Sequence, residues 1–235
     1  MPTSKPEKLA AAILTSVRSR ENVRVLYATP SEKLGRTSPK VLDGLEKDIG
    51  AGLPPEIRAF YSGAEQLGLV WQEDKGQETK EQPAGWNELC DTDGEFWQKA
   101  LRPSRDYSKR GGMICIPSAV EVFRKGYWID RIVPEPSDQE IELDGETFVD
   151  KVVFEELYPL DFITTYYCAG LWHNRKAGKW RVVLADGNGA DWTNYKTMSV
   201  AEYFEQLEKG LGGPRTFVST WGDEPKEIWA LRKEE

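Results

Sequence analysis

The sequence has very few of the residues that most often build a metal or catalytic centre. It contains one histidine, His173, and three cysteines, Cys90, Cys115 and Cys168, without CxxC spacing. Neither a zinc site nor a disulfide framework is expected, and the odd cysteine count is typical of reduced thiols in a cytosol. GxGxxG and GxxxxGK[ST] motifs are absent, so the sequence predicts no phosphate-binding loop of those types. We therefore expect no catalytic residues, no cofactor and no metal.

Long apolar runs are also missing from the sequence. No stretch approaches the roughly 20 apolar residues of a membrane span, and the N-terminus is amphipathic rather than patterned like a signal peptide. Leu9, Ile13 and Val17 recur at four-residue spacing, and Ser4 with Glu7 fits a capping box. We expect a docking helix here, no membrane contact and a cytoplasmic protein.

Basic residues are outnumbered by acidic ones, 31 to 39, and the excess of acids is concentrated in one segment. The net charge of the 235 residues is -8. Residues 135–156 hold nine acids and one base, Lys151, so this segment alone matches the whole imbalance. A nucleic-acid-binding protein normally carries a basic face, so direct binding to nucleic acid is not expected.

Two amphipathic helices meet at the motif Leu-Pro-Pro-Glu. Ser38-Pro39 opens the first helix, whose apolar stripe is Val41, Leu42, Leu45 and Ile49, and Gly50 ends it. Pro54 and Pro55 fit the first turn of a second helix, where the N–H groups have no intrahelical partner. The motif therefore predicts a fixed corner between the two helices.

The rest of the chain is dominated by strand patterns. Strands are predicted at 66–72, 160–172 and 179–185, and Asp144-Gly145 predicts a hairpin within 139–154. Capping boxes at Ser118 with Glu121 and at Ser199 with Glu202 start two later helices. The order predicts an α+β single domain over 1–235, a mostly antiparallel sheet with helices packed on it, and insertions near 73–112 and 126–160.

Several of these motifs occur together in a known family. Glu46, Ile49-Gly50, "LPPEIRAFY", a strand ending in "LVW", a later "ADGNGADW" and a closing "SVAEYFEQLEKGLG" follow in that order. This set resembles the SUKH superfamily, whose best-known branch is the Smi/Knr-like proteins, and covers roughly 38–72 and 179–211. The resemblance implies a SUKH-like α+β domain without established catalytic chemistry. Many bacterial members bind and neutralise toxins, and fungal relatives act in cell-wall and signalling control.

Alternative interpretations remain open for the acidic and turn residues. The acidic hairpin is either a surface that fits the basic cleft of a toxin nuclease or a charged edge that prevents aggregation. "DGNGAD" (186–191) lacks the spacing of a calcium loop and favours a turn. A nucleophile pair of Cys168 with His173 has no third group to orient it. A carboxylate-based hydrolase is the least favoured alternative.

The sequence therefore predicts a non-enzymatic immunity protein that binds a cognate toxin, for example a nuclease, in bacterial competition. The alternative is a regulatory or scaffold protein of the Smi/Knr type. Trp86 and Trp97 lie in polar sequence and are further candidates for exposed anchors. The expected partner is a protein, and the sequence does not determine the oligomeric state. The predicted partner-binding residues are Asp138, Glu140, Glu142, Asp144, Glu146, Asp150, Asp186, Asp191 and Trp192.

Overall fold

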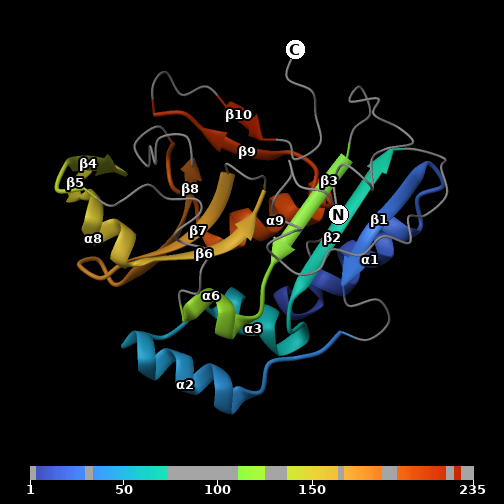
Figure 1. Ribbon diagram of the computed structural model, residues 1–235, viewed down its shortest axis with the longest axis horizontal. Coiled ribbons are helices and arrows are strands. Elements are labelled where there is room, and N and C mark those ends of the chain that lie inside the picture. Colours follow the sequence, from blue (N-terminus) through green and yellow to red (C-terminus); the bar gives the residue numbers. More distant parts are fainter. Residues whose placement is uncertain are drawn as a thin grey trace.

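The computed structural model describes residues 4–29, 34–73, 111–124, 137–163, 167–186, 195–220 and 225–228 (Figure 1). The elements in chain order are η1 (Pro6–Lys8), α1 (Leu9–Arg18), β1 (Val23–Thr29), α2 (Pro39–Ile49), α3 (Pro55–Gly63), β2 (Leu67–Glu73), β3 (Gly111–Ile116), α6 (Ala119–Phe123), β4 (Glu140–Leu143), β5 (Glu146–Val149), α8 (Asp150–Glu155), β6 (Leu157–Phe162), β7 (Tyr167–Asn174), β8 (Lys179–Asp186), α9 (Val200–Gly210), β9 (Arg215–Val218) and β10 (Pro225–Ile228). Helices pack on antiparallel sheets, so the predicted α+β class is confirmed.

Two three-stranded antiparallel sheets form the centre of the molecule, with strand orders β1-β2-β3 and β6-β7-β8 (Figure 1). β3 lies beside β6, so the two sheets meet edge to edge. Smaller antiparallel pairs, β4-β5 and β9-β10, lie at the periphery. Met198 forms a bridge with Val182, and the Lys196 N–H donates to the Val218 carbonyl at 2.8 Å. The segment 195–198 therefore connects β8 to β9.

Each face of these sheets carries its own buried cluster. The larger cluster joins the helices, for example through Phe60 of α3 and Leu207 of α9, to Trp71 of β2. The smaller cluster joins Val70 of β2 to Leu143 of β4 on the opposite face. Trp71 and Val70 are neighbours in sequence but belong to different clusters, as the two-residue period of a strand requires. The strands are therefore apolar on both faces.

The N-terminal helix begins differently from the sequence prediction. The turn η1 precedes α1, and its N-cap Lys5 makes no side-chain hydrogen bond, so the predicted Ser4–Glu7 capping box is wrong. The Ser4 N–H donates instead to the Glu208 carboxylate of α9 at 2.8 Å. Contact between η1 and α3 is close, because a Cβ on Gly63 would lie 1.8 Å from the Glu7 carbonyl oxygen. The predicted apolar stripe is buried: Leu9, Ile13 and Val17.

The predicted corner between α2 and α3 is confirmed. Gly50 ends α2 in the left-handed conformation with φ of 74°, and Pro55 is the first residue of α3. The Glu46 carboxylate accepts hydrogen bonds from the Leu53 N–H at 3.0 Å and from Arg58 Nη1 at 2.8 Å. Glu46 therefore holds the loop and the second helix together. Val41 is the exception in the predicted stripe, since 39% of it is exposed.

Two predicted strand boundaries are wrong. The continuous strand predicted at 160–172 is two strands, β6 and β7, which pair antiparallel with Phe162 opposite Cys168. The predicted hairpin segment also ends early, because α8 begins at Asp150. The first error arises because strands buried on two faces, such as β6 and β7, give a nearly continuous apolar run that hides a turn from periodicity alone.

A buried ion pair lies where β3 meets β6. Asp161 Oδ2 accepts hydrogen bonds from Arg215 Nη2 at 2.7 Å and from the Tyr203 hydroxyl at 2.5 Å. Asp161 Oδ1 accepts from the Cys115 N–H at 2.8 Å, and the Arg215 guanidinium donates to the Met113 carbonyl. These side chains therefore satisfy main-chain groups at the edge of β3. They connect the two sheets where no regular strand ladder is formed between the described strands.

Within the described residues, no helix is both long and apolar enough to cross a bilayer.

Candidate functional site

The acidic hairpin, defined as β4, β5 and the turn between them, is present as predicted. Asp144 and Gly145 form its two-residue turn with φ of 53° and 79°. Positive φ at both central positions is the requirement of a type I′ turn, and Asp-Gly meets it well. Leu143 lies opposite Glu146 next to the turn. On β4 the buried Leu143 follows the exposed Glu142, so the strand has one apolar and one acidic face.

Contacts at its face and its tip fix the hairpin to the rest of the molecule. The Phe148 ring packs edge-on against Trp172 of β7, with ring centroids 4.9 Å apart. At the tip, the Asp144 carboxylate accepts hydrogen bonds from the Thr197 N–H at 3.3 Å and from the Thr197 hydroxyl. Arg181 Nε lies 3.6 Å from the same carboxylate. The hairpin is therefore held at two places and is not a free arm.

Two of the predicted partner-binding acids have structural roles. Asp144 fixes the tip of the hairpin, as described above. Asp150 is buried and accepts hydrogen bonds from the Ser137 N–H at 2.8 Å and the Ser137 hydroxyl at 2.9 Å. A buried carboxylate with such partners contributes to local order. We therefore assign both residues to the support of the hairpin.

Two further acids of the segment are paired with lysines on the surface. Asp138 forms an ion pair with Lys151 of α8, and Glu146 Oε2 lies 3.4 Å from Lys176 Nζ. Exposed pairs of this kind contribute little to stability, but each lysine reduces the local negative potential. Lys151 belongs to the segment 135–156 and is already included in its charge count, whereas Lys176 comes from outside the segment and neutralises part of its acidic excess.

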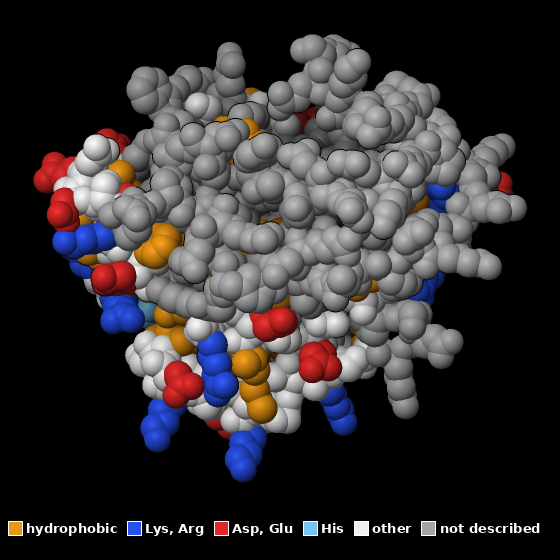
Figure 2. All heavy atoms as spheres, in the orientation of Figure 1, with side chains coloured by type: hydrophobic (Ala, Val, Ile, Leu, Met, Phe, Trp, Pro, Cys, Tyr) orange, Lys and Arg blue, Asp and Glu red, His pale blue; other side chains and the backbone are white. Residues whose placement is uncertain are grey.

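Glu140 and Glu142 differ from the other hairpin acids. Both side chains are exposed on the solvent face of β4. Among the residues that the structure describes, neither carboxylate has an ion-pair partner. Acidic side chains appear at the left edge of the space-filling view, where β4 and β5 lie in Figure 1, with Lys or Arg side chains beside them (Figure 2). The unneutralised charge of the hairpin is therefore concentrated at these two positions.

The side chains of the remaining predicted site residues lie outside the described part of the structure. Asp186 is the last residue of β8 and pairs with Tyr167, but its side chain lies outside the described residues. Asp191 and Trp192 also lie outside them, as do the two candidate anchors Trp86 and Trp97. The site as described therefore rests on the hairpin.

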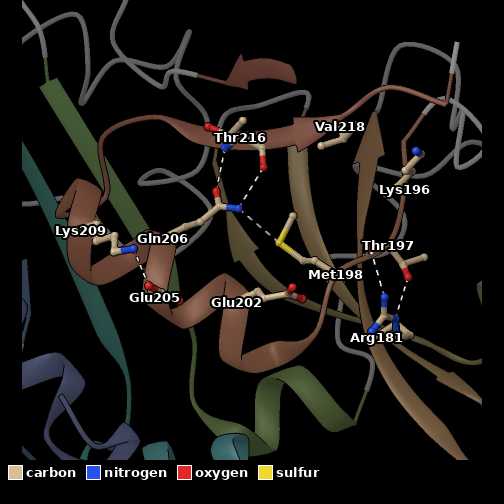
Figure 3. Close-up of a pocket in the computed structure, with 10 residues that line it drawn as sticks. All are labelled: Arg181, Lys196, Thr197, Met198, Glu202, Glu205, Gln206, Lys209, Thr216 and Val218. Atoms are coloured by element: carbon tan, nitrogen blue, oxygen red, sulfur yellow. Dashed lines mark hydrogen bonds and ion pairs between the residues drawn. The ribbon is translucent and has the colours of Figure 1, made fainter. Parts of the chain in front are cut away.

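An open groove lies beside the tip of the hairpin and was not predicted (Figure 3). Its walls come from α9, β8, β9 and the segment 196–198, and Thr197 and Arg181 belong to it while also contacting Asp144. The hairpin tip and the groove therefore form one continuous surface. The lining residues are Arg181, Lys196, Thr197, Met198, Glu202, Glu205, Gln206, Lys209, Thr216 and Val218.

Hydrogen bonds inside the groove are mostly used to hold it together. The Gln206 amide donates to the Thr216 carbonyl at 3.0 Å and accepts from the Thr216 N–H at 2.8 Å, as a neighbouring strand would (Figure 3). Glu202 forms a capping box with Ser199, and these hydrogen bonds lower the pKa of the Glu202 carboxyl. Glu205 pairs with Lys209 on the same helix. The groove offers charges of both signs together with the apolar side chains of Met198 and Val218.

The two residues considered as a nucleophile pair both lie on β7 but far apart. Five residues of strand separate Cys168 from His173, a distance of about 17 Å. The His173 ring stacks on Trp180 with centroids 4.5 Å apart, and Cys168 is buried. Burial and the nearby Arg175 charge lower the pKa of His173 because both disfavour the imidazolium form. The geometry gives no support to a catalytic pair.

Comparison of the chain with protein-family models, curated proteins and solved structures gives no match. In the described part of the chain, no group of three or more His, Cys, Asp or Glu side chains is arranged to hold a metal ion. The site is therefore interpreted from its own geometry, which is a fixed surface that carries charges of both signs.

The buried cluster of Asp161, Tyr203 and Arg215 was missed by the sequence analysis. Asp161 and Arg215 are 0% and 1% exposed, which is rare for charged residues unless they are paired. Burial and the Asp161 charge raise the pKa of Tyr203, so its hydroxyl stays protonated and donates. One signal was available: a single acid inside the apolar strand "LYPLDF" needs a buried cationic partner.

Proposed function

We propose that the chain is a non-enzymatic immunity protein that binds and neutralises a toxin of positive surface charge, such as a nuclease, in the cytoplasm. The observation that carries the proposal is the pair Glu140 and Glu142, which are exposed and have no ion-pair partner among the described residues, on a hairpin that is fixed at its face and tip. The SUKH resemblance supplies the class of partner.

Electrostatics explains how such a surface would act. Side chains two residues apart on one strand face lie about 7 Å apart, so the two carboxylates present adjacent charges to a partner. Complementary charge accelerates the encounter of two proteins and rejects partners of the wrong sign, and salt weakens this effect. Occlusion of a basic cleft then blocks access of an anionic substrate.

The hairpin is suited to binding because it needs little ordering. Fixing loops or side chains on binding costs conformational entropy, which makes the binding free energy less favourable. A surface that is already fixed avoids much of that cost. The bonds from Asp144 to Thr197 and the packing of Phe148 on Trp172 provide this preorganisation. The adjoining groove extends the surface that a partner at the hairpin tip would reach.

The test is co-expression of the chain with the toxin encoded beside its gene, followed by purification of the complex and stopped-flow measurement of association. The double substitution Glu140→Lys with Glu142→Lys should slow association at low salt by roughly tenfold and abolish most of the salt dependence. Neutralisation of the toxin should weaken in parallel.

A matched control is Glu21→Lys with Asp48→Lys, which changes the net charge equally at two exposed acids away from the hairpin. At about 0.1 M salt this control should leave association within about twofold, because screening then limits charge effects beyond about 10 Å. Equal slowing by both double variants would remove the hairpin assignment. Binding of a protein other than a toxin would favour the regulatory or scaffold alternative.

A further inference from the structure

The outer edge of β4 has main-chain groups that no described strand uses. Among the described residues, β4 pairs with β5 alone. In an antiparallel pair, alternate residues direct their N–H and C=O toward the partner strand, and the residues between them direct theirs away. A strand edge with unused groups of this kind can accept another strand.

The register identifies which residues face outward. The two-residue turn makes Leu143 and Glu146 a hydrogen-bonded pair. Gln139 lies four residues before Leu143, and Asp150 lies four residues after Glu146. The Asp150 N–H donates to the Gln139 carbonyl at 2.9 Å, as the alternation of bonded pairs requires. Odd-numbered residues of β4 therefore bond to β5, and Glu140 and Glu142 direct their N–H and C=O groups away from it.

The same two residues carry the unneutralised carboxylates of the hairpin. Glu140 and Glu142 place their side chains on the solvent face, and their backbone groups on the edge of β4 that pairs with no described strand. A strand added to this edge would set its residues opposite them at a Cα separation of about 5.5 Å. Opposite charges at such cross-strand positions attract, and like charges repel.

We propose that the edge of β4 binds an extended segment of the partner, with Lys or Arg at alternate positions opposite Glu140 and Glu142. The inference rests on the proposed function and adds the mode of recognition. The main-chain hydrogen bonds supply affinity and the two carboxylates select a basic strand. A purely acidic or apolar segment is not accepted, because it leaves the two carboxylates without a counter-charge.

The experiment uses the full chain labelled with ¹⁵N and a synthetic peptide of about eight residues, a usual strand length, in which lysine alternates with threonine or valine. A second peptide has glutamate in place of lysine. We expect saturable shifts of the Glu140 and Glu142 amide signals with the lysine peptide, weakened by salt. The glutamate peptide should give none. No saturable binding, or shifts confined to other elements, would overturn the proposal.

Two proline variants separate edge pairing from simple charge attraction. Glu142→Pro removes an outward N–H from β4 and keeps the bonds to β5, because proline is tolerated at strand edges. Thr147→Pro makes the same change directly opposite, on the outer edge of β5. Thermal unfolding of both variants checks that the protein stays folded. We expect Glu142→Pro to weaken lysine-peptide binding about tenfold and Thr147→Pro to change it less than twofold.

Because Glu142→Pro also removes a charge, Glu142→Gln is measured beside it. Loss of binding in the proline variant well beyond that in the glutamine variant supports strand addition. Equal losses in the two variants would show that charge alone acts and would overturn the edge inference. The proposed function is tested separately by toxin neutralisation, which the wild-type chain must perform even if the edge inference fails.

Discussion

Removing the charge of Asp161 should strongly destabilise the fold. Asp161→Asn keeps the size of the side chain but leaves the Arg215 guanidinium without its counter-charge at 1% exposure. The amide has one acceptor oxygen in place of two, so the Cys115 N–H or the Tyr203 hydroxyl loses its partner. The change therefore breaks the connection between β3, β6 and α9.

The expected magnitude follows from the burial of the pair. Breaking a fully buried ion pair by removing one partner typically costs about 3–5 kcal/mol, because the remaining charge is left uncompensated. Domains of this kind are stable by about 5–15 kcal/mol, so the variant should lose a large share of its stability. The double variant Asp161→Leu with Arg215→Met should lose less than Asp161→Asn, because no buried charge remains.

Urea unfolding followed by tryptophan fluorescence measures both variants. The midpoint should fall while the slope with urea stays constant, which separates a stability change from a change in the denatured state. A loss below about 1 kcal/mol for Asp161→Asn would refute the argument, since that is the range of an exposed pair. A double variant less stable than the single variant would refute the role of the uncompensated charge.

Three further substitutions test separate parts of the fold. Glu46→Gln removes the carboxylate at the helix corner and should cost about 1–2 kcal/mol in urea unfolding; an unchanged midpoint would contradict its role. Ser199→Ala should cost about 1 kcal/mol. In the folded protein the pKa of Glu202 is below its ordinary value of 4.5, so the capping box contributes to the free energy of unfolding above pH 4.5 and loses this contribution as the pH falls. The stability of Ser199→Ala should therefore depend less on pH below pH 4.5 than that of the wild type. Gln206→Ala should speed hydrogen exchange of the Thr216 amide at least tenfold, and exchange as slow as in the wild type would show another partner.

Local motifs were the most predictable part of this protein. The Asp144-Gly145 turn, the helix that starts at Pro55 and the capping box of Ser199 each depend on a few adjacent residues. Backbone preferences act at that range, so the sequence pattern was sufficient. The two-residue period also placed Leu143 on the buried face of β4. These elements fix the corner, the hairpin and the last helix.

Contacts between distant residues were not predictable in the same way. Asp161 and Arg215 are 54 positions apart, and nothing in either local pattern names the other. The pairing of Asp144 with Thr197 spans 53 positions, so the sequence predicted the Asp144 turn but not the contact of its side chain, which was assigned to partner binding. The count of acids in 135–156 was correct, but it could not show that Lys176 would approach from the turn between β7 and β8.

A chain of contacts connects the surface proposed for binding to the buried ion pair. Asp144 holds Thr197, which lies two residues before Ser199, the N-cap of α9. From α9, Tyr203 donates to Asp161 at the junction of the two sheets. The hairpin tip is thus positioned by the same helix that helps to close the core. Every contact in this chain is a hydrogen bond or a helix cap. The fold therefore determines the position of the hairpin surface before any partner binds. The acids that provide this order, Asp144 and Asp150, and the exposed acids without an ion-pair partner among the described residues, Glu140 and Glu142, are therefore different residues of one short segment.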